Sequence, residues 1–211
     1  YYAHVCNGGN QMKRLLLKYF YITRSILAIL AVVFIVIGAS LSYLVNPWVL
    51  TVLATVMLGM NVTATINMDK SSGWLKTVIT TPVNRKTFIN SKYLMYLLLS
   101  VIGLVFGVSF GLIACLILGQ STEMIGLFIC ISLTMALLSG SVILPCYFIF
   151  DESKSVLGTI LSYPISAGIF VSLILSLGKT TTTFIIIVFI AVCLFAISWY
   201  LSAKILAQKD I

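Results

Sequence analysis

The chain contains little charge and few of the side chains on which enzymes depend. Only 9% of its 211 residues are charged, and it has five acids and one histidine, His4. The acids are Asp69, Glu123, Asp151, Glu152 and Asp210. Acid–base catalysis and metal binding need clusters of His, Asp, Glu or Cys, and this set provides no candidate cluster. The sequence therefore predicts a protein that is not an enzyme.

The cysteines and glycines do not supply a cofactor site either. The five cysteines show no metal-ligand spacing, and four of them lie in apolar runs, where Cys acts as a small hydrophobic residue. They are Cys6, Cys115, Cys130, Cys146 and Cys193. A phosphate-binding GxxxxGK[ST] motif is also missing, so we expect the chain to hold no metal and no cofactor of its own.

Long apolar runs dominate the chain. Hydrophobic residues make up 61% of it, and its mean hydropathy is +1.15, so it has too little polar surface for a soluble domain. A membrane-spanning helix needs about 20 mostly apolar residues. The sequence predicts an all-α polytopic membrane protein with six spans, at residues 25–45, 47–66, 93–118, 124–150, 156–177 and 183–203.

We expect one transmembrane domain over residues 12–211. Residues 1–11 lack periodicity and precede a Met-Lys-Arg sequence at Met12, so they are left unassigned as possible upstream or cloning-derived residues. Residues 13–24 place apolar side chains opposite Lys and Arg, which predicts an N-terminal helix lying at the membrane surface before the first span.

The positive charges indicate an orientation. If six spans alternate, every Lys and Arg except Lys179 falls on one side, so both termini and the loop at residues 67–92 are predicted to be cytosolic. The net charge of +8 is then explained by topology and by attraction to anionic membrane lipids. We expect no nucleic-acid partner.

The loop at residues 67–92 is the only long polar interruption. Trp74, Leu75, Val78 and Ile79 share one side of a helical wheel, which predicts a short amphipathic helix over residues 73–81, with Ser71 or Ser72 as its cap. Pro82 should end this helix. A second helix, capped by Asn84, is expected to continue into the third span.

Several features lie within the spans. Asn61 and Thr65 in the second span should face other helices or a substrate pathway, because lipid cannot satisfy them. Gly103, Gly107 and Gly111 form GxxxGxxxG, a strip that permits close helix packing within a subunit or between subunits. Pro145 and Pro164 are candidate kinks or hinges in the fourth and fifth spans, and Pro164 could break the fifth.

The loop carries a family resemblance. Met68-Asp69, Trp74, Pro82-Val83 and Arg85-Lys86, followed by Ser91-Lys92-Tyr93-Leu94, resemble the permease subunits of ABC-2 type transporters. In that family, a helix in this loop seats in a groove of a separate ATPase. The resemblance therefore implies a bacterial cell-membrane protein that contacts an ABC ATPase through this loop, while ATP and Mg²⁺ bind to the ATPase. The residues implied to couple the two subunits are Asp69, Ser72, Trp74, Leu75, Val78, Ile79, Pro82, Arg85 and Lys86.

These features predict half of an ATP-driven exporter. Six spans imply a second permease, identical or related, and the apolar interior favours a hydrophobic or amphipathic substrate such as a peptide, lipid or drug. Small permeases of this kind resemble peptide exporters. The alternative is a membrane scaffold, sensor or immunity protein that holds a cytosolic partner through the same loop.

Overall fold

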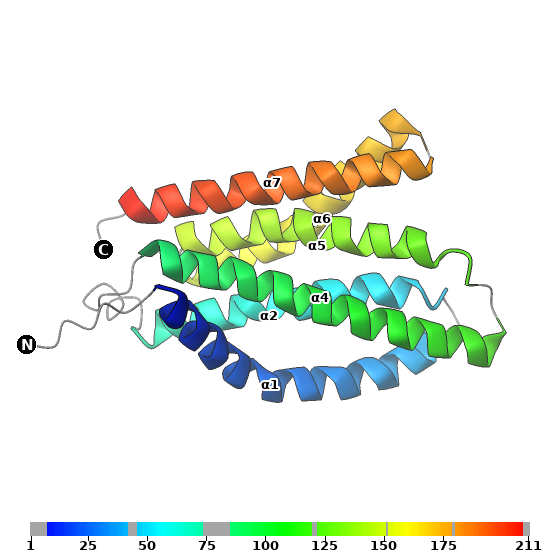
Figure 1. Cartoon of the computed structure of the whole chain (residues 1–211), viewed down its shortest axis with the longest axis horizontal. Coiled ribbons are helices and arrows are strands. Elements are labelled where there is room, and N and C mark those ends of the chain that lie inside the picture. Colours follow the sequence, from blue (N-terminus) through cyan, green and yellow to red (C-terminus); the bar gives the residue numbers. More distant parts are fainter. Residues whose placement is uncertain are drawn as a thin grey trace, which may run out of the picture.

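In a computed structural model, the described part of the chain forms a bundle of long helices (Figure 1). The structure describes residues 8–41, 46–73, 85–119, 122–150, 152–178 and 180–208. The helices, labelled as in Figure 1, are α1 (Gly8–Leu41), α2 (Val49–Ser71), α4 (Arg85–Leu118), α5 (Ile125–Ile149), α6 (Glu152–Leu177) and α7 (Thr181–Gln208). Each contains a stretch long and apolar enough to cross a membrane, which confirms the predicted all-α, six-span fold.

One end of the bundle collects most of the chain's positive charge. Here α1 begins, α2 ends, α4 begins, α5 ends, α6 begins and α7 ends, and we call this the loop end (Figure 1). The helix ends that the Lys and Arg pattern assigned to one side therefore lie at the same end of the described structure. Among them are the start of α1 and the end of α7.

The helix boundaries differ from the predictions near the N-terminus. Residues 8–41 form one helix, α1, which bends along its length but joins the predicted surface helix to the first span without a break (Figure 1). Part of the unassigned segment, from Gly8, also belongs to it. No proline interrupts this stretch, and once a helix has nucleated, each added residue gains a hydrogen bond.

The helices next to the loop are longer than predicted. α2 continues to Ser71 rather than ending at residue 66, and Gly73 terminates it with a left-handed φ of 67° and an N–H that donates to the Lys70 carbonyl at 3.1 Å. α4 begins at Arg85, as expected for a loop helix that continues into the third span. Its 34 residues extend about 51 Å, which exceeds the hydrocarbon thickness of about 30 Å.

The glycine strip of α4 packs against α2 of the same chain. A Cβ at Gly103 would lie 2.7 Å from the Ala54 carbonyl oxygen, and one at Gly107 would lie 2.7 Å from the Cα of Thr51. At Gly111 it would meet the Trp48 ring at 3.0 Å. The sequence left open whether this strip packs within one subunit or between two subunits. In the structure it packs within the subunit, where the backbones of α2 and α4 touch directly.

Hydrogen bonds then join α4 to α5 and α7. The Tyr93 hydroxyl contacts the hydroxyls of Ser198 and Ser202 on α7 at 2.9 and 2.8 Å, and the Tyr96 hydroxyl donates to the Ala136 carbonyl on α5 at 2.7 Å. These buried tyrosines pack among the aliphatic and aromatic residues of the main core. α4 is therefore bound to three neighbouring helices, and a movement of its first turns would be transmitted through the bundle.

The proposed break in the fifth span is absent. α6 is a single helix from Glu152 to Leu177 with Pro164 inside it, and α5 likewise continues through Pro145. Pro164 lies on an exposed face and Pro145 is half-buried. A proline costs one backbone hydrogen bond, which a long apolar helix in a membrane can absorb locally without ending.

Candidate functional site

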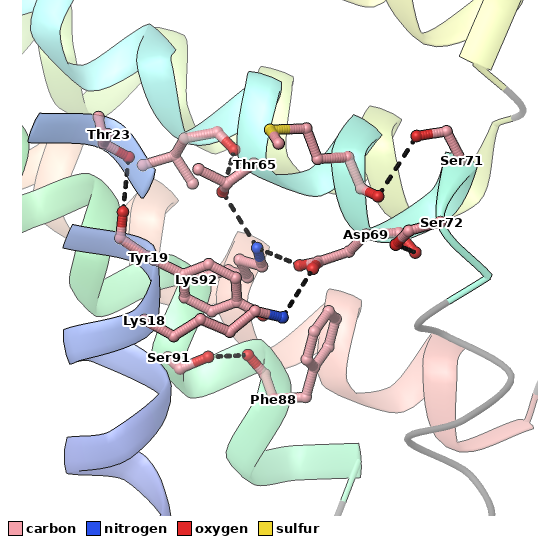
Figure 2. Close-up of polar contacts among 12 residues, drawn as sticks. Lys18, Tyr19, Thr23, Thr65, Asp69, Ser71, Ser72, Phe88, Ser91 and Lys92 are labelled. Atoms are coloured by element: carbon pink, nitrogen blue, oxygen red, sulfur yellow. Dashed lines mark hydrogen bonds and ion pairs between the residues drawn. The ribbon is translucent and has the colours of Figure 1, made fainter. Parts of the chain in front are cut away.

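A buried ion pair joins the two helices that flank the loop. The Lys92 Nζ on α4 lies 2.6 Å from the Asp69 Oδ2 on α2 and donates a second hydrogen bond to the Thr65 hydroxyl at 3.0 Å. The side chain of Lys92 is fully buried and that of Asp69 is 5% exposed. Figure 2 shows the Lys92 amine between the carboxylate and the hydroxyl.

Helix periodicity explains how α2 supplies both partners. Thr65 and Asp69 are four residues apart, so they lie one turn apart on the same face of α2. Asp69 is in the last turn, where a negative charge is unfavourable because the helix dipole already places partial negative charge there. The two lysines that approach it offset this cost.

Helix α1 contributes the third side of the site. The Lys18 Nζ lies 3.5 Å from the Asp69 Oδ1, and the Lys92 Nζ stands over the Tyr19 ring at 3.4 Å from its centroid (Figure 2). A cation over an aromatic face is attracted by the negative face of the ring, more strongly when water is excluded. Three helices distant in sequence therefore converge on one carboxylate, and we call Lys18, Tyr19, Thr65, Asp69 and Lys92 the ion-pair site.

Removing only one of the two buried charges in the ion-pair site should destabilise the fold. Bringing two ions out of water is costly, and good geometry with additional hydrogen bonds is needed to offset it. Removing one partner of a buried pair typically costs about 3–5 kcal/mol, because the other charge is left buried. The site therefore fixes the ends of α2 and α4 relative to each other.

A neighbouring contact connects the end of α2 to α5. The Lys70 Nζ donates to the carbonyl oxygen of Phe150, just beyond the last turn of α5, at 2.7 Å. A lysine is favourable there because helix C-terminal carbonyls carry partial negative charge. The start of the loop is thus attached to α4 through Asp69 and to the end of α5 through Lys70.

A family model described as "ABC-2 family transporter protein" matches residues 14–207. The chain belongs to the ABC-2 transporter family. No match was found among curated proteins or solved structures. The family match covers all six helices of this permease and agrees with the resemblance that the loop sequence indicated. It makes the protein a multi-pass component of a membrane transport system.

Of the coupling residues implied by the resemblance, Asp69 lies differently from the expectation. It is 3% exposed, and its carboxylate faces Lys92 and Lys18 within the permease instead of the surface. The reason is the extra length of α2, which keeps Asp69 on a helix that faces α4. Lys92, the last residue of the predicted loop, is buried in the bundle.

The remaining coupling residues are divided between the surface and the undescribed part of the loop. Ser72 is exposed at the end of α2, Arg85 begins α4, and Lys86 is exposed one residue later. Five predicted residues lie outside the described part of the chain: Trp74, Leu75, Val78, Ile79 and Pro82.

Two of the candidate pathway residues, Asn61 and Thr65, have hydrogen-bond partners of different kinds. Thr65 belongs to the ion-pair site, whereas the half-buried Asn61 donates through its Nδ2 to the Met57 carbonyl of its own helix at 2.9 Å. Interhelical or local hydrogen bonding, the simpler interpretation of the polar residues in α2, accounts for both side chains.

Sequence reasoning missed the contributions of Lys18 and Tyr19. It also counted Lys92 with the loop cations, although Lys92 is a buried partner of Asp69. The sequence did contain a signal for the Asp69–Lys92 pair. Asp69 is the only acid between residues 1 and 122, and Thr65 lies one turn before it on the same helix face. The participation of α1 had no such signal, because it depends on how three helices cross.

Proposed function

We propose that this permease moves a hydrophobic or amphipathic substrate out of a bacterial cell, using work from a separate ABC ATPase that contacts the segment between α2 and α4. ATP and Mg²⁺ would bind to that ATPase. The observation that carries the proposal is the buried Asp69–Lys92 pair, which connects the two ends of this segment. The termini and the loop end would then lie in the cytosol.

The contacts around the loop suit the transmission of force. Force applied between residues 72 and 84 would reach α2 and α4 together, because the ion pair joins their ends and the glycine strip joins their backbones. Lys18 and Lys70 extend the connection to α1 and to the end of α5. A change in the ATPase would therefore reorient several helices at once, as alternating access to a substrate path requires.

A second permease copy, identical or related, would complete the path. Large apolar side chains are exposed on the outside of the bundle, for example Leu116 on α4 at 79% and Leu175 on α6 at 78%. Such a surface needs lipid or another membrane protein to cover it. The alternative function is a scaffold, sensor or immunity protein, which would hold a partner through the same segment without transport.

One experiment separates docking from transmission. Trp74→Ala should abolish retention of the ATPase during purification, because a tryptophan at a protein interface typically contributes about 2 kcal/mol or more. Asp69→Asn should retain the ATPase but lose ATP-driven export, since Asp69 is buried inside the permease. Phe189→Ala, which removes an exposed aromatic side chain from α7 away from the loop end, is the control and should leave ATPase retention unchanged.

The measurements are co-purification, ATP hydrolysis by the complex and substrate export from vesicles. Retention of the ATPase by Trp74→Ala with normal export would disprove the docking assignment. A wild-type complex that hydrolyses ATP without exporting any hydrophobic or peptide substrate would favour the scaffold or sensor.

A further inference from the structure

A groove separate from the ion-pair site opens between α4 and α7 at the loop end. Its volume is about 490 Å³, within the range of small-molecule sites. It is lined by Lys86 and Asn90 of α4 and by Trp199, Tyr200, Ala203 and Lys204 of α7. The two charged residues among these are both lysines, so the groove matches a negatively charged ligand.

The groove walls follow from the spacing of these residues. Lys86 and Asn90 are one turn apart on α4, and Tyr200 and Lys204 are one turn apart on α7, so each pair lies on one helix face. The Trp199 Nε1 donates to the Asn90 Oδ1 at 2.8 Å across the two helices. This bond uses the oxygen of the amide, so the NH₂ group of Asn90 is the part that can donate to a ligand.

The depth of the groove places it at lipid headgroups. The groove lies at the first turns of α4 and the last turns of α7, the two helix segments Lys86–Leu118 and Thr181–Ile205 that are long and apolar enough to cross a membrane. Trp199 and Tyr200 follow the apolar run of α7, Lys204 lies one turn, about 6 Å, beyond Tyr200, and Asn90 lies at the depth of Trp199, to which it is hydrogen-bonded. Exposed Trp and Tyr side chains are typical of this depth, and lysines there meet lipid phosphates.

We propose that this groove binds an anionic phospholipid, with the lysines at its headgroup phosphate and Trp199 and Tyr200 against the glycerol region and upper acyl chains. A soluble ATPase is a poorer occupant, since it would have to enter the headgroup layer to reach Trp199. The lipid would bridge α4, which follows the loop, and α7, which ends the described chain. The permease would then depend on anionic lipid for the stability of this helix pair, whatever substrate it carries.

The test is lipid titration of the purified full-length permease in detergent, followed by native mass spectrometry. The probes are phosphatidylglycerol and phosphatidylcholine with identical acyl chains. Phosphatidylglycerol should bind more tightly, and Lys204→Gln should weaken its binding about fivefold, the effect of one lysine near an anionic headgroup. The Lys86→Gln/Lys204→Gln double variant should bind the two lipids nearly equally, and Lys204→Arg should retain the preference.

Lys154→Gln is the matched control, because Lys154 is an exposed lysine at the same end of the bundle, on α6. It should bind phosphatidylglycerol as the unmodified permease does. If Lys154→Gln lost as much phosphatidylglycerol binding as Lys204→Gln, the binding would reflect general attraction between lysines and anionic lipid, and the proposal would be overturned. Equal binding of the two lipids by the unmodified permease would also overturn it, as would a double variant that keeps its lipid preference but loses the ATPase. Size-exclusion profiles of all variants exclude misfolding as the cause.

Discussion

Neutralising Asp69 should destabilise the permease more than removing the lysine that pairs with it. In Asp69→Asn, the fully buried Lys92 ammonium keeps only a neutral amide, the Thr65 hydroxyl and the Tyr19 ring as partners, with a second cation, Lys18, nearby. Loss of one partner of a buried pair costs about 3–5 kcal/mol, and the amide oxygen that remains places this variant at about 3 kcal/mol.

Removing the lysine in Lys92→Met should destabilise the permease less, because Asp69 keeps a second cation, Lys18, as a partner. In Lys92→Met, the carboxylate can still approach Lys18, whose side chain is 37% exposed and can carry water to the site. We expect about 1–2 kcal/mol for this variant. The double variant removes both charges and should lie close to Lys92→Met, so the coupling free energy of the pair should equal the cost of Asp69→Asn, about 3 kcal/mol.

The assay is reversible unfolding of the purified permease in mixed micelles, with the four proteins of the double-mutant cycle measured together. Lys18→Gln is the control, since a half-exposed ion pair at 3.5 Å should contribute at most about 1 kcal/mol. Additive effects of Asp69→Asn and Lys92→Met would refute the reasoning, as would a larger loss in Lys92→Met than in Asp69→Asn.

Two further predictions concern packing and topology. Gly107→Ala should destabilise the same unfolding transition by about 1–3 kcal/mol, because its Cβ would lie 2.7 Å from the Thr51 backbone, whereas Gly168→Ala, with open space around it, should be neutral or stabilising. Equal stability of the two variants would mean that α2 and α4 separate easily. In a cysteine-free background, Ser72→Cys should react with a membrane-impermeant maleimide only from the cytosolic side and Thr181→Cys only from outside, and labelling of both from one side would contradict the six-span topology.

The sequence could predict the helices because each depends on a local property. About 20 apolar residues suffice to specify a span, and the charge pattern correctly grouped the ends that share the loop end. The boundary of α2 was wrong because Asp69 and Lys70 look like loop residues in a linear sequence. Within the fold, both side chains have partners, so the helix can continue to Ser71.

Contacts between distant helices could be anticipated only in part. GxxxGxxxG correctly predicted a close helix contact, but its partner, α2, depends on the three-dimensional arrangement. The pairing of Asp69 with Lys92 spans 23 residues and that with Lys18 spans 51. The α4–α7 groove combines residues more than a hundred positions apart, and no short motif marks it.

The distribution of burial indicates which helices can move at the lowest cost. In the most apolar stretch of α2, 56% of residues are buried, against 11% in those of α1 and α6. Helices with few buried contacts separate from a bundle more easily than helices with many. α1 meets the ion-pair site through the Tyr19 ring and through the longer and more exposed of the two salt bridges, Lys18–Asp69, whereas α2 and α4 share the short buried one. A movement that starts in the loop should therefore carry α2 and α4 as a unit, and the contact between α1 and this unit is where the site should first open.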